Sequence, residues 1–148
     1  QDTRPNQGPA STEVDDDLIG IWNGEKFVFS SSSNPLVLIP KLIWRYGVSP
    51  YKVIPAVKAA IAKYKNIYTL QTQNISFTSP RELFQKIDLY NETQQSAYDY
   101  FDSLGVDNLF VEEFIDGASR DEYNQNGTIN VFVDLVALAG AGVTGSVY

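Results

Sequence analysis

Three dipeptides place proline directly after a residue that caps helices: Asn34-Pro35, Ser49-Pro50 and Ser79-Pro80. An Asn or Ser side chain accepts a hydrogen bond from the first turn of a helix, and proline at the first helical position gives up no helical hydrogen bond. The three pairs therefore predict three helix starts and a mainly helical chain. Glu82, three residues after Ser79, also predicts a capping box.

The spacing of apolar residues gives the length of each helix. The first, Pro35 to Tyr46, is apolar nearly all round, so it either lies at the centre of the core or lines an apolar ligand, and Gly47 can end it. Pro40 and Pro55 lie inside the first two helices and predict kinks there. The other helices expected here are Pro50 to about Tyr68, Arg81 to Leu89, and about Glu92 to Leu104, with Asn91 as a cap and Gly105 as a stop.

A fifth helix is expected after Asp107, which can cap it. Phe110, Phe114 and Ala118 recur every four residues and form a stripe that faces a core. The apolar spacing then ends, and a polar and aromatic segment follows from Arg120 to Asn126. This segment is either a binding loop held by the packed helix or a solvated exit from it.

The rest of the chain predicts one β-hairpin and one further helix. Leu18 to Phe29 alternates apolar residues on two arms, and Asn23-Gly24 between them suits a type I′ turn. The apolar run Thr128 to Ala139 is long enough for a buried helix, although its Val and Ile residues also suit a strand, and we expect a helix. The predicted fold is mainly α with one β-hairpin (α+β), with an acidic tail or linker at 1–17 and one helical domain over 18–148.

The composition excludes several kinds of chemistry. The chain has no Cys and no His, which removes disulfides, thiolate nucleophiles, Cys/His zinc sites and a Ser-His-Asp triad. We assign no metal ligand and no catalytic residue. A net charge of −7 argues against nucleic acid as a partner. No stretch reaches the roughly eighteen consecutive apolar residues that a transmembrane helix needs.

Two local patterns resemble functional motifs but have simpler explanations. Gly140 to Gly145 matches G-x-G-x-x-G, but we expect no helix and second strand of a dinucleotide-binding unit after it, and so no cofactor role for these glycines. Glu112 and Glu113 are adjacent on the fifth helix, where neighbours point in different directions, so we expect a solvated edge there.

Three Asn-x-Ser/Thr sequons occur at Asn74, Asn91 and Asn126. Such a sequence is an acceptor for N-glycosylation on a secreted or lumenal protein. The sequons therefore favour a secretory route, and the acidic pI near 4.4 is compatible with an acidic compartment.

Three segments, in order, resemble the prenylcysteine oxidase family, also called prenylcysteine lyase. The most specific is Lys41-Leu42-Ile43-Trp44-Arg45-Tyr46-Gly47, an apolar helix that ends in Trp-Arg-Tyr-Gly. The hairpin Ile19 to Phe29 precedes it, and Phe114-Ile115, leading to Arg120 and Tyr123-Asn124-Gln125, follows. The resemblance runs from about Asp17 to the C-terminus and corresponds to an interior, substrate-side region of a longer family chain.

The resemblance implies an FAD-dependent flavoprotein of the amine-oxidase type. Family members oxidise the thioether of S-farnesyl- or S-geranylgeranyl-cysteine to cysteine, a prenyl aldehyde and hydrogen peroxide, and travel the secretory route to the lysosome or vacuole. The family's FAD-binding segments lie outside the matched region. The implied partners are therefore a prenylated cysteine and the remainder of the flavoprotein, and we expect this chain to be inactive alone.

The resemblance also suggests substrate-binding residues. Trp44, with Phe110 and Phe114, would wall an isoprenoid cavity. Arg120, Tyr123 and Gln125 would orient the cysteine end. Between Arg and Tyr the family usually has a small apolar residue and Asn, whereas this chain has Asp121 and Glu122. The alternative is a non-catalytic helical domain that binds a lipid or a protein through the same apolar surface.

Overall fold

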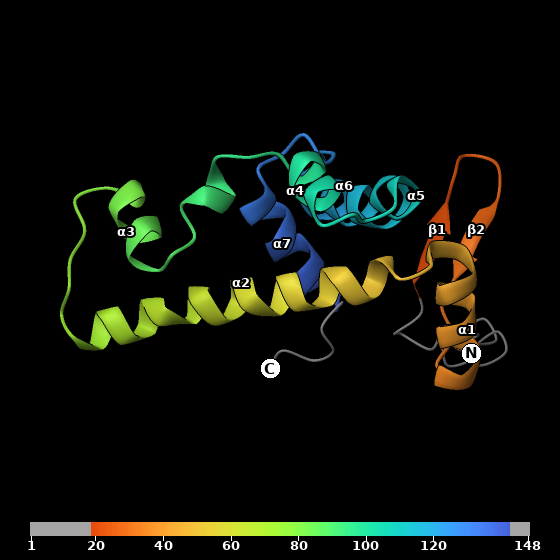
Figure 1. The fold of residues 1–148 in the computed structure, drawn as a ribbon, viewed down its shortest axis with the longest axis horizontal. Coiled ribbons are helices and arrows are strands. Elements are labelled where there is room, and N and C mark those ends of the chain that lie inside the picture. The colour runs from red at the N-terminus through yellow and green to blue at the C-terminus, as the bar shows by residue number, and fades with distance from the viewer. Residues whose placement is uncertain (1–18, 143–148) are drawn as a thin grey trace, which may run out of the picture.

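The computed structural model describes residues 19–142, which form one antiparallel hairpin and a set of helices (Figure 1). The predicted class, mainly α with one β-hairpin, is confirmed. The expected tail at 1–17 and the end of the Gly140–Gly145 motif lie outside the described residues. In order, the elements are β1 (Gly20–Trp22), β2 (Phe27–Ser30), α1 (Pro35–Tyr46), α2 (Ser49–Thr72), α3 (Pro80–Lys86), the 3₁₀ turn η1 (Asn91–Thr93), α4 (Ala97–Ser103), α5 (Asn108–Phe110), the π-helical turn η2 (Val111–Ile115), α6 (Asp116–Tyr123) and α7 (Val131–Gly140).

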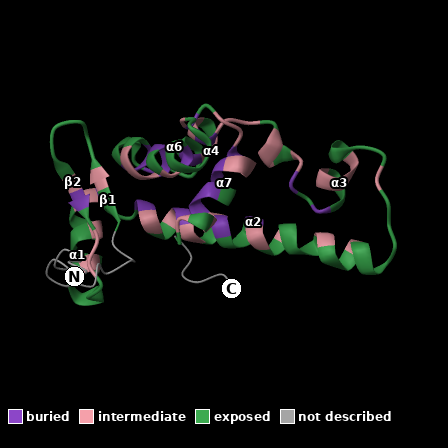
Figure 2. Cartoon of the chain, turned by 180° about the vertical axis from the view of Figure 1, so that it is seen from behind, coloured by how far each residue is buried: buried purple, intermediate pink, exposed green. Residues whose placement is uncertain are grey.

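The long helix α2 forms the base of the molecule. Helix α7 packs against the first half of α2, and α4 and α6 pack against α7 above it, while the hairpin and α1 lie at the N-terminal end of α2 (Figure 1). Helix α7 is central because α2, α4, α6 and η1 all pack against it. Buried residues concentrate around α7 and on the facing side of α2 (Figure 2). They include Val53 and Val57 of α2, Phe101 of α4, Ile115 of η2, and Val131, Leu135 and Leu138 of α7.

Two of the three predicted proline-preceding caps are confirmed. Asn34 accepts a hydrogen bond from the Leu36 amide, and Ser79 accepts one from the Glu82 amide. The third is wrong, because Ser49 lies inside α2 and its hydroxyl accepts a hydrogen bond of 2.9 Å from the Asp107 amide. Ser49 therefore ties the start of α2 to the turn before α5.

Glu82 closes its capping box one residue earlier than the pattern predicts. Its Oε2 atom accepts hydrogen bonds from the amide and the hydroxyl of Thr78, at 2.9 and 2.8 Å. Helix α3 ends at Lys86 rather than at Leu89, while α2 continues past Tyr68 to Thr72.

The fourth helix begins later than predicted. Asn91 starts only the short turn η1, and α4 begins at Ala97 with Ser96 as its cap. The physical reason is a long-range pairing: the Ala97 amide donates to the Ile129 carbonyl, and the Val131 amide donates to the Gln95 carbonyl. Residues 95–97 therefore pair with 129–131 and are not free to form a helical turn.

The segment after Asp107 is one continuous helical rod from α5 through η2 to α6. Asp107 caps it as predicted, and the Leu109 amide is its donor. The rod continues to Tyr123 and ends at Asn124, which has a left-handed conformation. Arg120 and Tyr123 therefore lie on the helix, and the expectation that they sit in an exit loop is wrong. The last helix is confirmed, but it begins at Val131 after the cap Asn130.

The hairpin is confirmed, but its turn is not type I′. Trp22 pairs with Phe27, so four residues form the connection. Only Gly24 has a positive φ, at 98°, whereas a type I′ turn also needs one at Asn23. The Asn23 side-chain oxygen instead accepts hydrogen bonds from the Glu25 and Lys26 amides, which holds a wider turn.

Candidate functional site

The C-terminal end of α1 is clasped to η2 by Glu113. Arg45 donates from Nε and Nη2 to the two carboxylate oxygens, at 2.7 and 2.5 Å, and the Tyr46 hydroxyl donates at 3.0 Å. The bond with Arg45 lowers the pKa of Glu113 and raises the pKa of Arg45. Glu112 is exposed as expected, but for Glu113 the solvated edge is wrong, because that residue fixes α1.

A row of aromatic rings runs beside this clasp. The Tyr46 ring lies 5.7 Å from Phe29 of the hairpin and meets Phe110 edge-on at 5.1 Å. Phe110 in turn stacks on Phe114, with centroids 5.1 Å apart and planes at 8°. Burial, the largest cause, raises the pKa of Tyr46, with the Glu113 carboxylate adding to it. Arg45 and Tyr46 of the Trp-Arg-Tyr-Gly motif thus join α1 and the hairpin to the helical rod.

The rest of α1 presents an apolar stripe to solvent. Tyr46 is the only buried residue of this helix. Leu36 is 84% exposed and Trp44 88% exposed, with Ile39 and Ile43 between them on the same side of the helix. We call Leu36, Ile39, Ile43 and Trp44 the α1 face. The prediction that α1 lies at the centre of the core is therefore wrong, while the alternative, that it lines an apolar ligand, stays a prediction.

The first residue of α6, Asp116, carries a buried carboxylate. Asp116 accepts hydrogen bonds from the Tyr98 hydroxyl (2.8 Å), the Gly127 amide (2.7 Å) and Arg120 Nη2 (3.1 Å). Gly127 packs directly against Tyr98, where an added Cβ would come within 2.5 Å of the ring. Burial raises the pKa of Tyr98, and its bond to Asp116 adds to the shift. This cluster anchors the Arg120 guanidinium, whose side chain is 60% exposed.

The predicted substrate-binding residues therefore fall into two groups. Phe110 and Phe114 are stacked together beside the clasp, and Trp44 lies on the α1 face. Arg120 and Tyr123 are on α6, and Gln125 is an exposed residue just after it. Sequence reasoning missed the buried carboxylates Asp116 and Asp134. A signal was present for Asp134, the one acid inside the apolar run 128–139.

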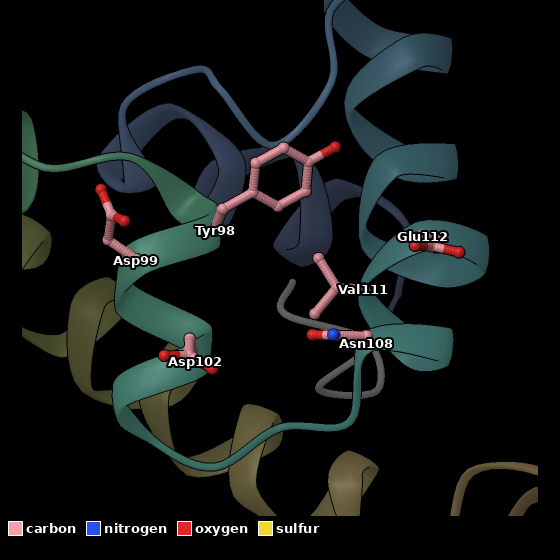
Figure 3. Close-up of a pocket in the computed structure, with 6 residues that line it drawn as sticks. All are labelled: Tyr98, Asp99, Asp102, Asn108, Val111 and Glu112. Atoms are coloured by element: carbon pink, nitrogen blue, oxygen red, sulfur yellow. The ribbon is translucent and has the colours of Figure 1, made fainter.

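A hollow of about 360 Å³ opens between α4 and the helical rod. Figure 3 shows Tyr98 of α4 pointing across the hollow toward Val111 and Asn108 of the rod, with Asp99 and Asp102 at the α4 rim and Glu112 on the rod. None of the predicted substrate-binding residues takes part in this lining. Three carboxylates around an open hollow do not suit an isoprenoid chain, because their desolvation is costly.

Within residues 19–142 no group of acidic side chains could hold a metal ion, and no helix is long and apolar enough to cross a membrane. The sheet of this described part is one antiparallel pair. A dinucleotide such as FAD needs parallel strands and a glycine-rich turn leading into a helix. The described residues therefore do not fit the pyrophosphate of FAD.

Comparison with known proteins gives one consistent answer. A model of the prenylcysteine lyase family matches residues 29–145. Prenylcysteine oxidase 1 of Mus musculus is 29% identical over 137 residues, which cover 90% of this chain and 27% of the mouse protein. The Homo sapiens protein of that name is 28% identical over 135 residues, 89% of this chain and 27% of the human one.

Prenylcysteine oxidase 1-like of Bos taurus is 28% identical over 124 residues, 82% of this chain and 25% of the bovine protein. The chain spans about a quarter of the length of these relatives, in which the matched region is only one part. Because the family model covers most of the sequence, the chain belongs to the prenylcysteine lyase family.

Proposed function

We propose that this chain is the substrate-side part of an FAD-dependent prenylcysteine oxidase. In the whole enzyme, the thioether of a farnesyl- or geranylgeranyl-cysteine would be oxidised by FAD, water would release cysteine and a prenyl aldehyde, and oxygen would accept the electrons as hydrogen peroxide. FAD would be held by segments outside residues 19–142. The observation that carries the proposal is the exposed α1 face in a member of this family.

The α1 face has the chemistry that a prenyl chain needs. Its four side chains are apolar and lie along one side of a helix whose C-terminal end is clamped to Glu113 by Arg45 and Tyr46. Covering an apolar group contributes about 0.8 kcal/mol per CH₂, so a fifteen-carbon chain supplies several kcal/mol. A rigid apolar face of this kind is therefore suited to hold the isoprenoid.

The polar end of the substrate would be oriented from α6. Arg120 is pinned through Nη2 to Asp116, which leaves other guanidinium N–H groups of this exposed side chain for a carboxylate. Tyr123 and Gln125 are also exposed and could donate to the same group. Phe110 is buried, so its role would be to support Phe114 by stacking rather than to touch the substrate.

Tryptophan fluorescence tests whether the α1 face binds the substrate. A Trp22→Phe chain reports from Trp44 alone, and S-farnesylcysteine is titrated below its micelle concentration. A saturable change is expected, lost in Ile43→Asp and retained in Val136→Asp, which alters an exposed apolar residue of α7. The absence of a saturable change would contradict substrate binding by this chain.

A non-catalytic domain that binds a lipid or a protein is the second candidate, and the same exposed face favours it. Sedimentation separates the two. Self-association that Ile43→Asp abolishes, without a response to S-farnesylcysteine, would favour a protein-binding domain.

We expect no peroxide from the isolated chain with FAD and S-farnesylcysteine added, and peroxide production would show that it carries the chemistry itself.

We also propose that the protein follows the secretory route to a lysosome or vacuole and carries N-glycans. Asn74 and Asn91 are exposed. Asn126 is half-buried, and its side-chain oxygen accepts a hydrogen bond of 2.7 Å from the Thr128 hydroxyl of the same sequon. When the wild-type chain is expressed in a secretory host, glycosidase treatment should lower its mass. Each Asn→Gln variant at an occupied site should lose correspondingly less mass.

A further inference from the structure

A second carboxylate is buried in the helical body, in the first turn of α7. Asp134 is fully buried, and the Ser119 hydroxyl of α6 donates to its Oδ1 atom. Its Oδ2 atom has no hydrogen-bond partner among the described residues. An ionised carboxylate with an unpartnered oxygen is costly in such a place, whereas the protonated acid is much less so.

The charge next to Asp134 increases this cost. Asp116 lies three residues before Ser119 on α6, on the same side of the helix, and is itself buried. Burial raises the pKa of Asp134 to about 7; the Ser119 hydrogen bond opposes this rise and the charge of Asp116 adds to it. Two helices are therefore packed together through a carboxylate that favours its neutral form.

The titratable groups on the elements packed against α7 offer no compensating cation in contact with Asp134. On α6, Arg120 is bound to Asp116, and Asp121, Glu122 and Tyr123 are exposed. On α2 and η1, Lys63 is paired with Asp88 and Glu92, and Lys52 donates to the Gly105 carbonyl. The other titratable residues of α2 are exposed: Tyr51, Lys58, Tyr64, Lys65 and Tyr68. On α4, the Tyr98 hydroxyl is bound to Asp116, Asp99 accepts from Ser96, Tyr100 is half-buried and Asp102 is exposed.

We propose that Asp134 is a proton-operated latch between α6 and α7. At acidic pH the neutral side chain lets the two helices pack tightly. Above neutral pH the buried charge loosens them, together with the end of α6 that carries Arg120 and Tyr123. The inference rests on the packing of the helices and is independent of the proposed substrate.

The direction of the effect follows from proton binding. The unfolded chain releases the Asp134 proton near pH 3.8, while the folded protein keeps it to about pH 7. Stability from this group is therefore greatest below pH 4 and is lost as the pH rises to 7. In that window the folding equilibrium constant falls by up to about tenfold per pH unit.

Urea unfolding of the whole chain at pH 5 and pH 8 tests the latch against Asp134→Asn, which keeps the shape and removes the titration. The ratio of the unfolding constants of the two proteins should change roughly eightyfold between the two pH values. Asp121→Asn, at an exposed position on α6, is the matched control. The ratio of its unfolding constant to that of the wild type should be nearly the same at pH 5 and pH 8. A ratio for Asp134→Asn that does not change with pH would overturn the proposal.

A second measurement covers the case in which Asp134→Asn does not fold. Carboxyl ¹³C NMR follows the ionisation of Asp134 directly in the wild-type chain and in Ser119→Ala, which removes its one donor. The wild-type midpoint should lie near neutral pH, and Ser119→Ala should move it upward. Amide exchange in α6 and α7, corrected for intrinsic rates, should accelerate above that midpoint. A titration midpoint of Asp134 near pH 4 would overturn the latch. So would amide exchange rates in α6 and α7 that do not change across the midpoint.

Discussion

Helices α1 and α7 are both strongly apolar, yet they have opposite surroundings. Helix α7 is enclosed by α2, α4 and α6, and Val131, Leu135 and Leu138 are buried. Helix α1 buries only Tyr46 and exposes the α1 face. The comparison shows that an apolar helix indicates a need for cover without indicating where that cover comes from. In α7 it comes from this chain, and for α1 we propose a prenyl chain.

The surroundings of the two helices also differ in the hydrogen bonds that a carboxylate receives. Glu113 beside α1 receives a two-pronged hydrogen bond from Arg45, so its charged form is favoured and its pKa falls. Asp134 in α7 receives a single hydroxyl, so its neutral form is favoured. Acidic conditions should therefore strengthen the α7 side of the molecule and weaken the clasp at α1.

Truncating an aromatic residue in each region should give the largest contrast. Phe101→Ala opens a cavity beside α7 and should cost about 3–5 kcal/mol of unfolding free energy. Trp44→Ala removes an exposed side chain and should change stability by less than about 0.5 kcal/mol. Urea unfolding measures both. A large cost for Trp44→Ala would mean that the α1 face is already covered in solution, for example by a second copy.

The clasp should have an intermediate effect. Arg45→Met leaves Glu113 partly buried without its cation and should cost about 1–2 kcal/mol. Glu113→Gln should cost a similar amount, and the double variant should cost much less than the sum. Asp88→Asn, which removes an ion pair with an 83% exposed carboxylate, is the control and should cost under about 0.5 kcal/mol. Additive costs at Arg45 and Glu113 would show that the pair is not coupled.

The acid dependence of the clasp sharpens the contrast with Asp134. Because the pKa of folded Glu113 lies below its ordinary 4.5, the stability it contributes is present above pH 4.5 and is lost as the pH falls through the folded value. The stability difference between the wild type and Glu113→Gln should therefore shrink below pH 4.5. A difference that stays constant down to pH 3 would rule out ionised Glu113 as the partner of Arg45.

Local signals in the sequence predicted the helices well and their contacts poorly. Asn34-Pro35 marks a real helix start because a cap and its first turn are neighbours in the chain. The helix start predicted at Asn91 was wrong because residues 95–97 pair with 129–131, a long-range contact that a local sequence pattern does not indicate. The Ser49-Pro50 pair predicted a cap, and this prediction also failed because of a distant contact: the Ser49 hydroxyl accepts from the Asp107 amide.

The candidate site was less predictable than the fold. Arg45 and Glu113 lie 68 positions apart, and a regular helical spacing gave no reason to expect the π-helical turn that carries Glu113. The apolar pattern of α1 could not decide between a place in the core and contact with an apolar ligand, because both share the same pattern. Burial of Asp134 could have been suspected from its apolar neighbours, whereas its single donor, Ser119, depends on how α6 packs.

Removing a helix cap in each region should give the smallest effects and the most local test. Asn130 accepts from the Val133 amide at the start of α7, and Asn34 accepts from the Leu36 amide at the start of α1. Asn130→Ala should lower the global unfolding free energy by about 1 kcal/mol, because α7 cannot fray without opening the core. Asn34→Ala should change it by only a few tenths of a kcal/mol, since the first turn of α1 lies away from the clasp at Arg45 and can fray alone. Its main effect should be faster amide exchange in 36–39. If Asn34→Ala instead lowers global stability as much as Asn130→Ala, the first turn of α1 folds cooperatively with α7 and does not fray alone.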